Sequence, residues 1–214
     1  MAHSGENCIA VAPGANYSLL PGSITHFSEV IDEADIIVIQ AEIPYETIKK
    51  IALSAKQKGK KVLFNPAPAC LIDEELMKAI DILVVNELEA AFISGIEYTG
   101  NNLEEIALSL LQAGARNAVI TLGSQGVYMK NDKEIIQLPG YKVNAIDTIA
   151  AGDTFCGALA VICAQREIDR DALSFANAAA AIAVTRSGAQ PSIPTLDEVK
   201  HFMLEKELAL SFNF

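Results

Sequence analysis

The 214-residue sequence lacks several features that mark large classes of proteins. No apolar run approaches the length of a membrane-spanning helix. Basic residues are few, because 16 lysines and arginines accompany 27 aspartates and glutamates, and no basic patch of five or more appears. A nucleic-acid-binding surface needs such a patch, so the net charge of −11 argues against one. We therefore expect a soluble protein that binds neither nucleic acid nor a membrane.

Cysteine is also scarce and is not arranged for a structural role. Cys8 and Cys70 lie far from the others, and only Cys156 and Cys163 are spaced for one helix. This pattern contains no metal-binding spacing and no disulfide framework, so we expect reduced thiols, as in a cytoplasm. The first seven residues have neither the basic region nor the apolar core of a signal peptide. The sequence therefore predicts a cytoplasmic protein.

What the sequence does contain is a regular alternation of apolar strands and helical patterns. Half of the residues are apolar and a fifth are charged, and the length suits one domain. We expect helices at 24–33, 45–58, 73–79, from 86 onward, 103–113, 151–164, 171–185 and 196–208. The expected strands are 7–13, 35–40, 62–65, 81–85, 118–122, 127–130, 134–138 and 142–146. Such alternation predicts the α/β class with a mostly parallel sheet.

The stretch from Asn144 to Leu159 combines a turn of small residues with the start of an alanine-rich helix. We expect a strand to end at Ile146, a tight turn at 150–152 and the helix to begin near Asp153. Helix starts attract anions, because the first-turn amides are unpaired and the helix dipole is positive there. Asp153 is then either a general base that removes a hydroxyl proton during phosphoryl transfer or simply an N-cap. The local sequence favours neither interpretation.

The same stretch resembles the signature of the ribokinase-like (PfkB) carbohydrate kinases, Asp-Thr-x-x-Ala-Gly-Asp-x-Phe, at Asp147, Thr148, Ala151, Gly152, Asp153 and Phe155. The wider family usually has glycine where Ala150 stands. A second segment, 178–194, is similar to the C-terminal part of the same family, and the resemblance extends over essentially the whole chain. It implies a single domain, 1–214, with a three-layer α/β/α Rossmann-like fold and a mostly parallel central sheet.

The resemblance implies an ATP-dependent sugar kinase. Asp153 would deprotonate the primary hydroxyl of a pentose, D-ribose, and the products would be ADP and ribose 5-phosphate. The amides of Ala151, Gly152 and Asp153 would form an anion hole for the transferring phosphoryl group, so catalysis would be positioning plus electrostatics. Glu42 would contact a sugar hydroxyl, although without the resemblance a solvated loop carboxylate would be the better interpretation.

Other candidate residues have both a functional and a structural interpretation. Asn86 and Glu89 match an Asn-x-x-Glu motif that lies beside the nucleotide phosphates and helps to hold Mg²⁺, but they also form a capping-box pair. Asn177 matches a position near adenine, although helix packing explains it equally well. The loop after strand 118–122 resembles a nucleotide-binding loop, and by itself it would predict a hairpin turn. Its candidate residues are Thr121, Gly123, Ser124 and Gly126.

The resemblance also implies a site for a monovalent cation, K⁺, in the loop before the last helix. A bound K⁺ would order the neighbouring anion-binding turn. Otherwise this loop is an ordinary turn rich in proline and glycine. The matching positions are Asp147, Ile149, Ala183, Arg186, Gly188 and Ser192.

The beginning of the chain resembles a mid-chain segment of the family. We therefore expect an N-terminally truncated fold without the lid and without most of the sugar-binding loops. One alternative to a working kinase is an incomplete nucleotide-binding fragment that associates through an exposed sheet edge, which predicts homo-oligomers. A dinucleotide-dependent oxidoreductase is a remote alternative, because no Gly-x-Gly-x-x-Gly motif opens a helix after the first strand.

Overall fold

The computed structural model describes residues 12–206, and within them six strands form one sheet in sequential order. The pairs β1–β2, β2–β3 and β3–β4 are parallel, whereas β4–β5 and β5–β6 are antiparallel, so only β5 runs against the other strands. The strands are β1 (Ile36–Gln40), β2 (Lys61–Asn65), β3 (Ile82–Asn86), β4 (Ala118–Thr121), β5 (Val127–Lys130) and β6 (Ile135–Leu138). The expectation of a mostly parallel sheet is confirmed. Most of the strand expected at 7–13 lies outside the described residues.

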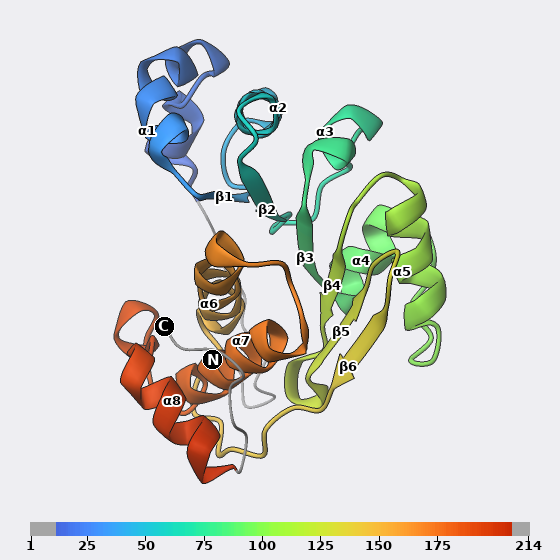
Figure 1. Ribbon diagram of the computed structural model, residues 1–214, viewed down its shortest axis with the longest axis vertical. Coiled ribbons are helices and arrows are strands. Elements are labelled where there is room, and N and C mark those ends of the chain that lie inside the picture. The colour runs from blue at the N-terminus through green and yellow to red at the C-terminus, as the bar shows by residue number, and fades with distance from the viewer. Residues whose placement is uncertain (1–11, 207–214) are drawn as a thin grey trace.

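Helices cover both faces of the sheet and make three layers (Figure 1). One face carries α2 (Tyr45–Gln57), α3 (Glu74–Ala79), α4 (Glu87–Ser94) and α5 (Leu103–Gln112). The other face carries α6 (Ala151–Gln165) and α7 (Arg170–Ala183), and α8 (Leu196–Glu205) packs on α7. The predicted three-layer α/β/α fold is therefore present. No helix between residues 12 and 206 is long and apolar enough to cross a bilayer.

The strand β3 illustrates why the sheet sits at the centre. Ile82 and Val84 pack with α6, α7 and α8, whereas Leu83 and Val85 pack with the opposite helical layer. All four side chains are buried. A strand with two buried faces needs apolar residues at every position, which explains the continuous apolar run.

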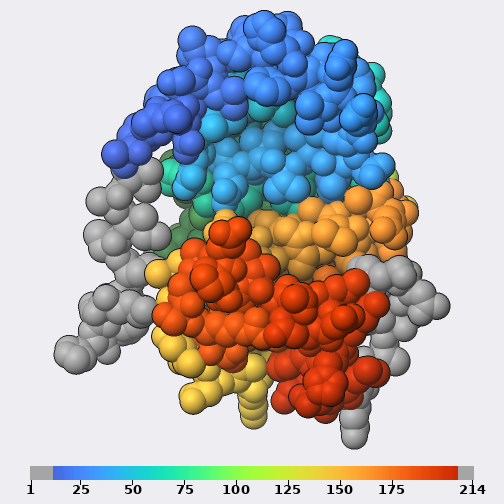
Figure 2. Space-filling view, turned by 90° about the vertical axis from the view of Figure 1, so that its left-hand side faces the viewer, coloured from blue at the N-terminus to red at the C-terminus, as the bar shows by residue number. Residues whose placement is uncertain are grey.

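The N-terminal segment differs from the single helix expected at 24–33. It forms two 3₁₀ helices, Gly14–Ser18 and Pro21–Phe27, and only Ser28–Glu33 is α-helical (α1). Within the second of these 3₁₀ helices the hydroxyl of Thr25 donates to the carbonyl of Gly22 at 3.0 Å. Figure 2 shows these segments, in blue, at one end of the molecule, with the orange and red helices at the other.

The strand expected at 142–146 is absent, so this expectation was wrong. Beyond β6 the chain leaves the sheet and passes to the end of α7, where the amides of Ile146 and Asp147 donate to the carbonyl of Val184 at 2.7 and 3.2 Å. Ile146 is 63% exposed. The alternation of apolar and polar residues resembled a strand, but these two amides donate to a carbonyl at the end of a helix and not to a neighbouring strand.

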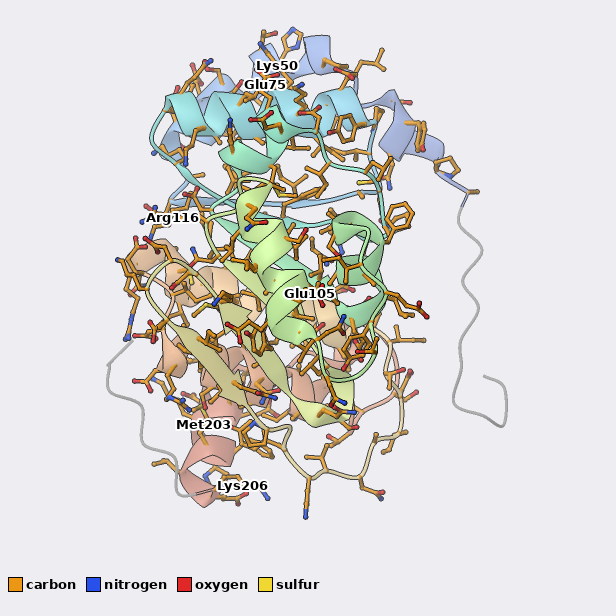
Figure 3. The ribbon with its side chains drawn as sticks, turned by 90° about the vertical axis from the view of Figure 1, so that its right-hand side faces the viewer. Lys50, Glu75, Glu105, Arg116, Met203 and Lys206 are labelled. Atoms are coloured by element: carbon orange, nitrogen blue, oxygen red, sulfur yellow. The ribbon has the colours of Figure 1, made fainter. Side chains whose placement is uncertain are left out.

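Ion pairs surround Asp81, which lies directly before β3. Asp81 is buried and accepts from the amide of Val62 at 3.0 Å, and it lies 3.3 Å from Lys56 and 3.6 Å from Arg116. Figure 3 shows Arg116 beside the sheet, and Glu105 on the outward side of α5. This cluster ties α2, β2 and β3 to the turn before β4.

Candidate functional site

Asp153 lies in the first turn of α6 and not at its N-cap. The helix begins at Ala151, so Asp153 is its third residue, and the N-cap position is taken by Ala150, which makes no side-chain cap hydrogen bond. The N-cap interpretation of Asp153 is therefore wrong. Its exposed carboxylate accepts a hydrogen bond from Nε2 of Gln40 at 2.8 Å.

The turn before α6 is strained at Ala150. With φ 60°, Ala150 is the one non-glycine residue with positive φ between residues 12 and 206. A left-handed conformation costs an L-residue about 1–2 kcal/mol, and glycine adopts it without this penalty. This penalty explains why the family that the sequence resembles usually has glycine where Ala150 stands. The turn is held because the amide and hydroxyl of Thr154 both donate to the carbonyl of Ala150, at 2.9 and 2.8 Å.

The amides at the start of α6 are available to an anion. The amide of Ala151 donates weakly to the carbonyl of Thr148, at 3.3 Å. The amides of Gly152 and Asp153 have no hydrogen-bond partner within the part of the chain that the structure describes. The two free donors and the positive end of the 15-residue helix α6 could hold an anion, and we refer to residues 148–153 as the anion-binding turn.

A cavity of about 500 Å³ lies beside this turn. It includes most of the residues that the sequence predicted for a nucleotide: Thr121, Gly123, Ser124, Gly126, Ala151, Gly152 and Asn177. The cavity also contains Thr148 and Phe155, which the sequence had singled out only as part of the signature. Sequence reasoning missed the remaining walls, which are Gly140, Tyr141, Lys142, Val143, Ala145, Ala180, Ala181 and Val184. Residues 177, 180, 181 and 184 follow helical spacing, so the small side chains of α7 were a usable signal. Residues 142–145 were not predicted as a cavity wall, because the sequence was interpreted as a strand there.

The glycine-rich loop between β4 and β5 has both of its expected properties. It forms a hairpin connection, with a 3₁₀ turn at Gly123–Gln125, and it lines the cavity. Asn177 likewise lines the cavity while its Nδ2 donates to the carbonyl of Pro139 at 3.0 Å. Packing and ligand contact are therefore compatible at both places.

A second cavity of about 380 Å³ adjoins the first and shares Thr121 and Gly152 with it. Three carboxylates line this acidic pocket, from the loop after β1, from α4 and from α6: Glu42, Glu89 and Asp153. None of the lining residues is basic. Its other walls are Gln40, Asn65, Ala67, Asn86 and Cys156, so Asn86 belongs to this pocket and not to the first cavity. A ligand can therefore extend from the first cavity, past Gly152, to Asp153.

The capping box at Asn86 and Glu89 is confirmed. Oδ1 of Asn86 accepts from the amide of Glu89 at 2.8 Å, and Oε2 of Glu89 accepts from the amide of Asn86 at 2.9 Å. Burial raises the pKa of Glu89, and the nearby charge of Glu87 adds to the rise, while the amide of Asn86 opposes it. The pocket thus contains a partly buried carboxylate whose charged form a cation would stabilise.

The donor set of the acidic pocket fits Mg²⁺, because it consists of carboxylate and amide oxygens. Among residues 12–206, however, no three His, Cys, Asp or Glu side chains form a metal cluster. Mg²⁺ at Glu89 would therefore take most of its ligands from water and phosphate, which it readily does.

The cysteine in the acidic pocket is not a nucleophile. Burial raises the pKa of Cys156 to about 12, and the charges of Asp153 and Glu89 contribute. The thiol is therefore neutral near pH 7. Cys70, Cys156 and Cys163 are free, as expected, and Cys8 lies outside the described residues.

Three of the positions matched to the implied K⁺ site, those of Asp147, Ile149 and Gly188, are joined by hydrogen bonds next to the turn before α6. Asp147 is 5% exposed, and its carboxylate accepts from the amides of Ile149 and Gly188, both at 3.0 Å. The hydroxyl of Ser192 donates to the carbonyl of Ala189 at 2.6 Å. Asp147 therefore joins the turn before α6 to the loop after α7.

The other two matching positions share one turn at the end of α7. The amide of Arg186 donates to the carbonyl of Ala183 at 3.0 Å. The side chain of Arg186 pairs with Glu198 on α8 at 2.6 Å, and this contact is the main reason that the pKa of Glu198 falls to about 2. A cation near this loop would not meet an unbalanced positive charge from Arg186.

Sequence reasoning missed Gln40 and Asn65. They end β1 and β2 and lie opposite each other in the strand register. Nε2 of Gln40 donates to Oδ1 of Asn65 at 3.3 Å as well as to Asp153, and Nδ2 of Asn65 donates to the carbonyl of Val84 at 2.9 Å. Polar residues that end two neighbouring parallel strands were the available signal, because ligands bind at this edge.

Fold and site together define an α/β protein with a nucleotide-sized cavity, an anion-binding helix start and an acidic pocket. Residues 1–196 match the pfkB family carbohydrate kinases. The chain is 40% identical over 197 residues to a ribokinase of Staphylococcus aureus, covering 91% of this chain and 65% of that protein. The chain therefore belongs to the pfkB family.

Solved structures agree with this assignment. A ribokinase from Thermotoga maritima matches with a TM-score of 0.83 and 40% identity, covering 94% of this chain and 67% of that one. A ribokinase from Arabidopsis thaliana complexed with ribose and ATP matches with a TM-score of 0.85 and 29% identity, covering 97% and 66%. The chain spans about two thirds of the length of the relatives that it matches.

Proposed function

We propose that the chain is an ATP-dependent sugar kinase of ribokinase type that phosphorylates D-ribose at its 5-hydroxyl. The observation that carries this proposal is the position of Asp153, whose carboxylate lines the acidic pocket directly after Gly152, which lines both cavities. A phosphoryl donor in one cavity and an acceptor hydroxyl in the other would meet at this point. Membership of the pfkB family and the relative complexed with ribose and ATP support the same assignment.

The chemistry follows from the two sides of the first turn of α6. ATP would occupy the 500 Å³ cavity with its γ-phosphoryl group against the amides of Ala151, Gly152 and Asp153. The carboxylate of Asp153 would accept the proton of the 5-hydroxyl as that oxygen attacks the γ-phosphorus. The bond between the γ-phosphorus and the oxygen that bridges it to the β-phosphate breaks, and ADP leaves. Glu42, which also lines the acidic pocket, would contact another sugar hydroxyl.

Two cations complete the proposal. Glu89, with Asn86 beside it, would hold Mg²⁺, which supplies positive charge to the phosphates in a pocket without basic side chains. A K⁺ ion would bind at the loop after α7 and act on the anion-binding turn through the Asp147 to Gly188 contact. Its proposed positions are Asp147, Ile149, Ala183, Arg186, Gly188 and Ser192.

We also propose a cytoplasmic location, in keeping with the free thiols.

The experiment is ADP release from MgATP by the purified chain, with and without D-ribose and K⁺. We expect ribose-dependent turnover that falls by about 10²–10⁴ in Asp153→Ala, the usual contribution of a general base. The matched control is Asp197→Ala, which removes an exposed first-turn aspartate of α8 and should leave turnover unchanged. Chelation of Mg²⁺ should abolish turnover.

The acceptor sugar needs its own comparison, because a deoxyribokinase of Salmonella typhi is 32% identical over 203 residues. We expect D-ribose to give a higher kcat/KM than 2-deoxyribose. If the wild-type chain binds ATP but shows no sugar-dependent turnover, the kinase proposal fails and the nucleotide-binding fragment remains.

A further inference from the structure

The end of β1 contributes a side chain that contacts the proposed base. Nε2 of Gln40 lies 2.8 Å from Oδ1 of Asp153 and 3.3 Å from Oδ1 of Asn65. We propose that Gln40 is a positioning residue that holds the carboxylate of Asp153 for proton transfer, and that Asn65 fixes the orientation of the Gln40 amide. The proposal rests on the function proposed above, in which Asp153 is the base.

The orientation of the Gln40 amide follows from a chain of donors and acceptors. A side-chain amide has one end that only donates and one that only accepts. Nδ2 of Asn65 donates to the backbone carbonyl of Val84 at 2.9 Å, so Oδ1 of Asn65 faces Gln40 as an acceptor. The NH₂ group of Gln40 must then face Asn65, and its second hydrogen is available to Asp153. The main chain of β3 thereby determines which end of Gln40 meets the carboxylate.

Asp153 needs such a partner because its own helix supplies none. In α4 the carboxylate of Glu89, also at the third helical position, reaches back to the N-cap amide. In α6 no capping box forms, and within residues 12–206 Gln40 is the one side chain that donates to Asp153. Without Gln40 the carboxylate could rotate toward the unpaired first-turn amides, where it would occupy the proposed phosphoryl site.

A neutral donor also suits a general base better than a cation would. An arginine or lysine would form a charge-assisted bond that competes with proton transfer, whereas an amide fixes the carboxylate without adding charge. The acidic pocket has no basic lining residue that could take this role. The structure therefore places an uncharged donor where the chemistry needs position only.

The first test compares Gln40→Met with Gln40→Glu. Methionine removes the donor, and glutamate keeps the shape but faces Asp153 with a second carboxylate. We expect ribose-dependent kcat to fall about 10-fold with methionine and further with glutamate, while the KM for ATP stays within about twofold of wild type. A role in packing alone predicts the opposite order, because glutamate is the better steric match. Gln112→Met, at the exposed end of α5, is the control.

The second test does not depend on activity. The side-chain amide resonance of Gln40, identified in ¹H–¹⁵N spectra by its loss in Gln40→Met, should shift in Asp153→Asn and stay in place in Asp197→Asn. An unshifted resonance would overturn the contact on which the proposal stands.

The two proposals fail in different ways. If Gln40→Met turns over as fast as the wild-type chain, the positioning role is refuted and the kinase proposal stands. Absence of sugar-dependent turnover in the wild-type chain refutes the kinase and with it any catalytic role of Gln40.

Discussion

At the scale of single residues, Asp147 shows how one carboxylate connects two loops. Its oxygens accept from the amides of Ile149 and Gly188, both at 3.0 Å, although 41 sequence positions separate Asp147 from Gly188. Both hydrogen bonds favour the charged carboxylate and lower the pKa of Asp147 below its ordinary value of 3.8. The bond from the amide of Ile149 has the larger effect, and the bond from Gly188 has the second largest. The anion-binding turn is thus tied to the loop after α7 by a charge-dependent contact.

This contact predicts a pH-dependent stability. A carboxyl group whose pKa is lower in the folded state stabilises the fold above its unfolded value of 3.8, and the contribution is lost as the pH falls through the folded value. We expect Asp147→Asn to unfold at lower urea concentration than wild type at pH 7, and the difference to shrink as the pH falls below 3.8. Urea titrations at several pH values measure this, with Asp132→Asn as the exposed control. An equal loss at every pH would contradict a role for the charge.

At the scale of elements, the hairpin of β4 and β5 is clamped against the chain that leaves β6. Gly126 has φ 102°, and a Cβ there would lie 2.1 Å from the carbonyl oxygen of Leu138. A Cβ on Gly140 would lie 2.2 Å from the carbonyl oxygen of Ser124. These neighbours are backbone atoms and cannot move aside. The close approach positions the glycine-rich wall of the nucleotide-sized cavity.

We therefore expect Gly126→Ala to destabilise the protein by about 3 kcal/mol, through positive φ and the backbone clash together. The control is Gly157→Ala in α6, where a Cβ meets nothing within 4 Å. Alanine should stabilise that helix position by roughly 0.5–1 kcal/mol. Chemical denaturation measures both values, and ATP titration should show weaker binding only for Gly126→Ala. A Gly126→Ala protein as stable as wild type would show that the loop can relax.

At the scale of the whole molecule, β1 is an exposed edge. It pairs only with β2 among the described strands, and Val38 in its middle is 46% exposed. Figure 2 shows the neighbouring N-terminal segments on this side of the molecule. Unpaired strand amides beside apolar side chains favour pairing with another chain.

We expect the chain to form homo-oligomers whose mass rises with concentration in light scattering. Val38→Lys should shift the equilibrium toward the monomer, because a charged side chain on an edge strand opposes pairing. Leu204→Lys, which changes an exposed residue of α8, is the control and should have no effect. A monomer at every concentration would rule out association through this edge.

Local sequence was sufficient for most elements and for part of the site. The apolar run of β3, the capping box of Asn86 and Glu89, and the small-residue turn before α6 each depend on neighbours within a few positions. Hydrogen bonds and steric limits of this kind act along the chain, so the sequence predicts them directly. The helix start at Ala151 and the hairpin turn at Gly123–Gln125 were predicted for the same reason.

Tertiary structure alone decided the contacts that cross the molecule. Gln40 and Asp153 are 113 positions apart, and no local pattern indicates that the end of β1 meets the start of α6. Residues 142–146 had the alternation of a strand, yet the amide of Ile146 donates to the carbonyl of Val184 at the end of α7. The sequence by itself determined most of the strands and helices and the turn of small residues where an anion could bind. Which polar ends meet there depends on the order of the strands and the packing of α6, because such contacts form only after the layers have assembled.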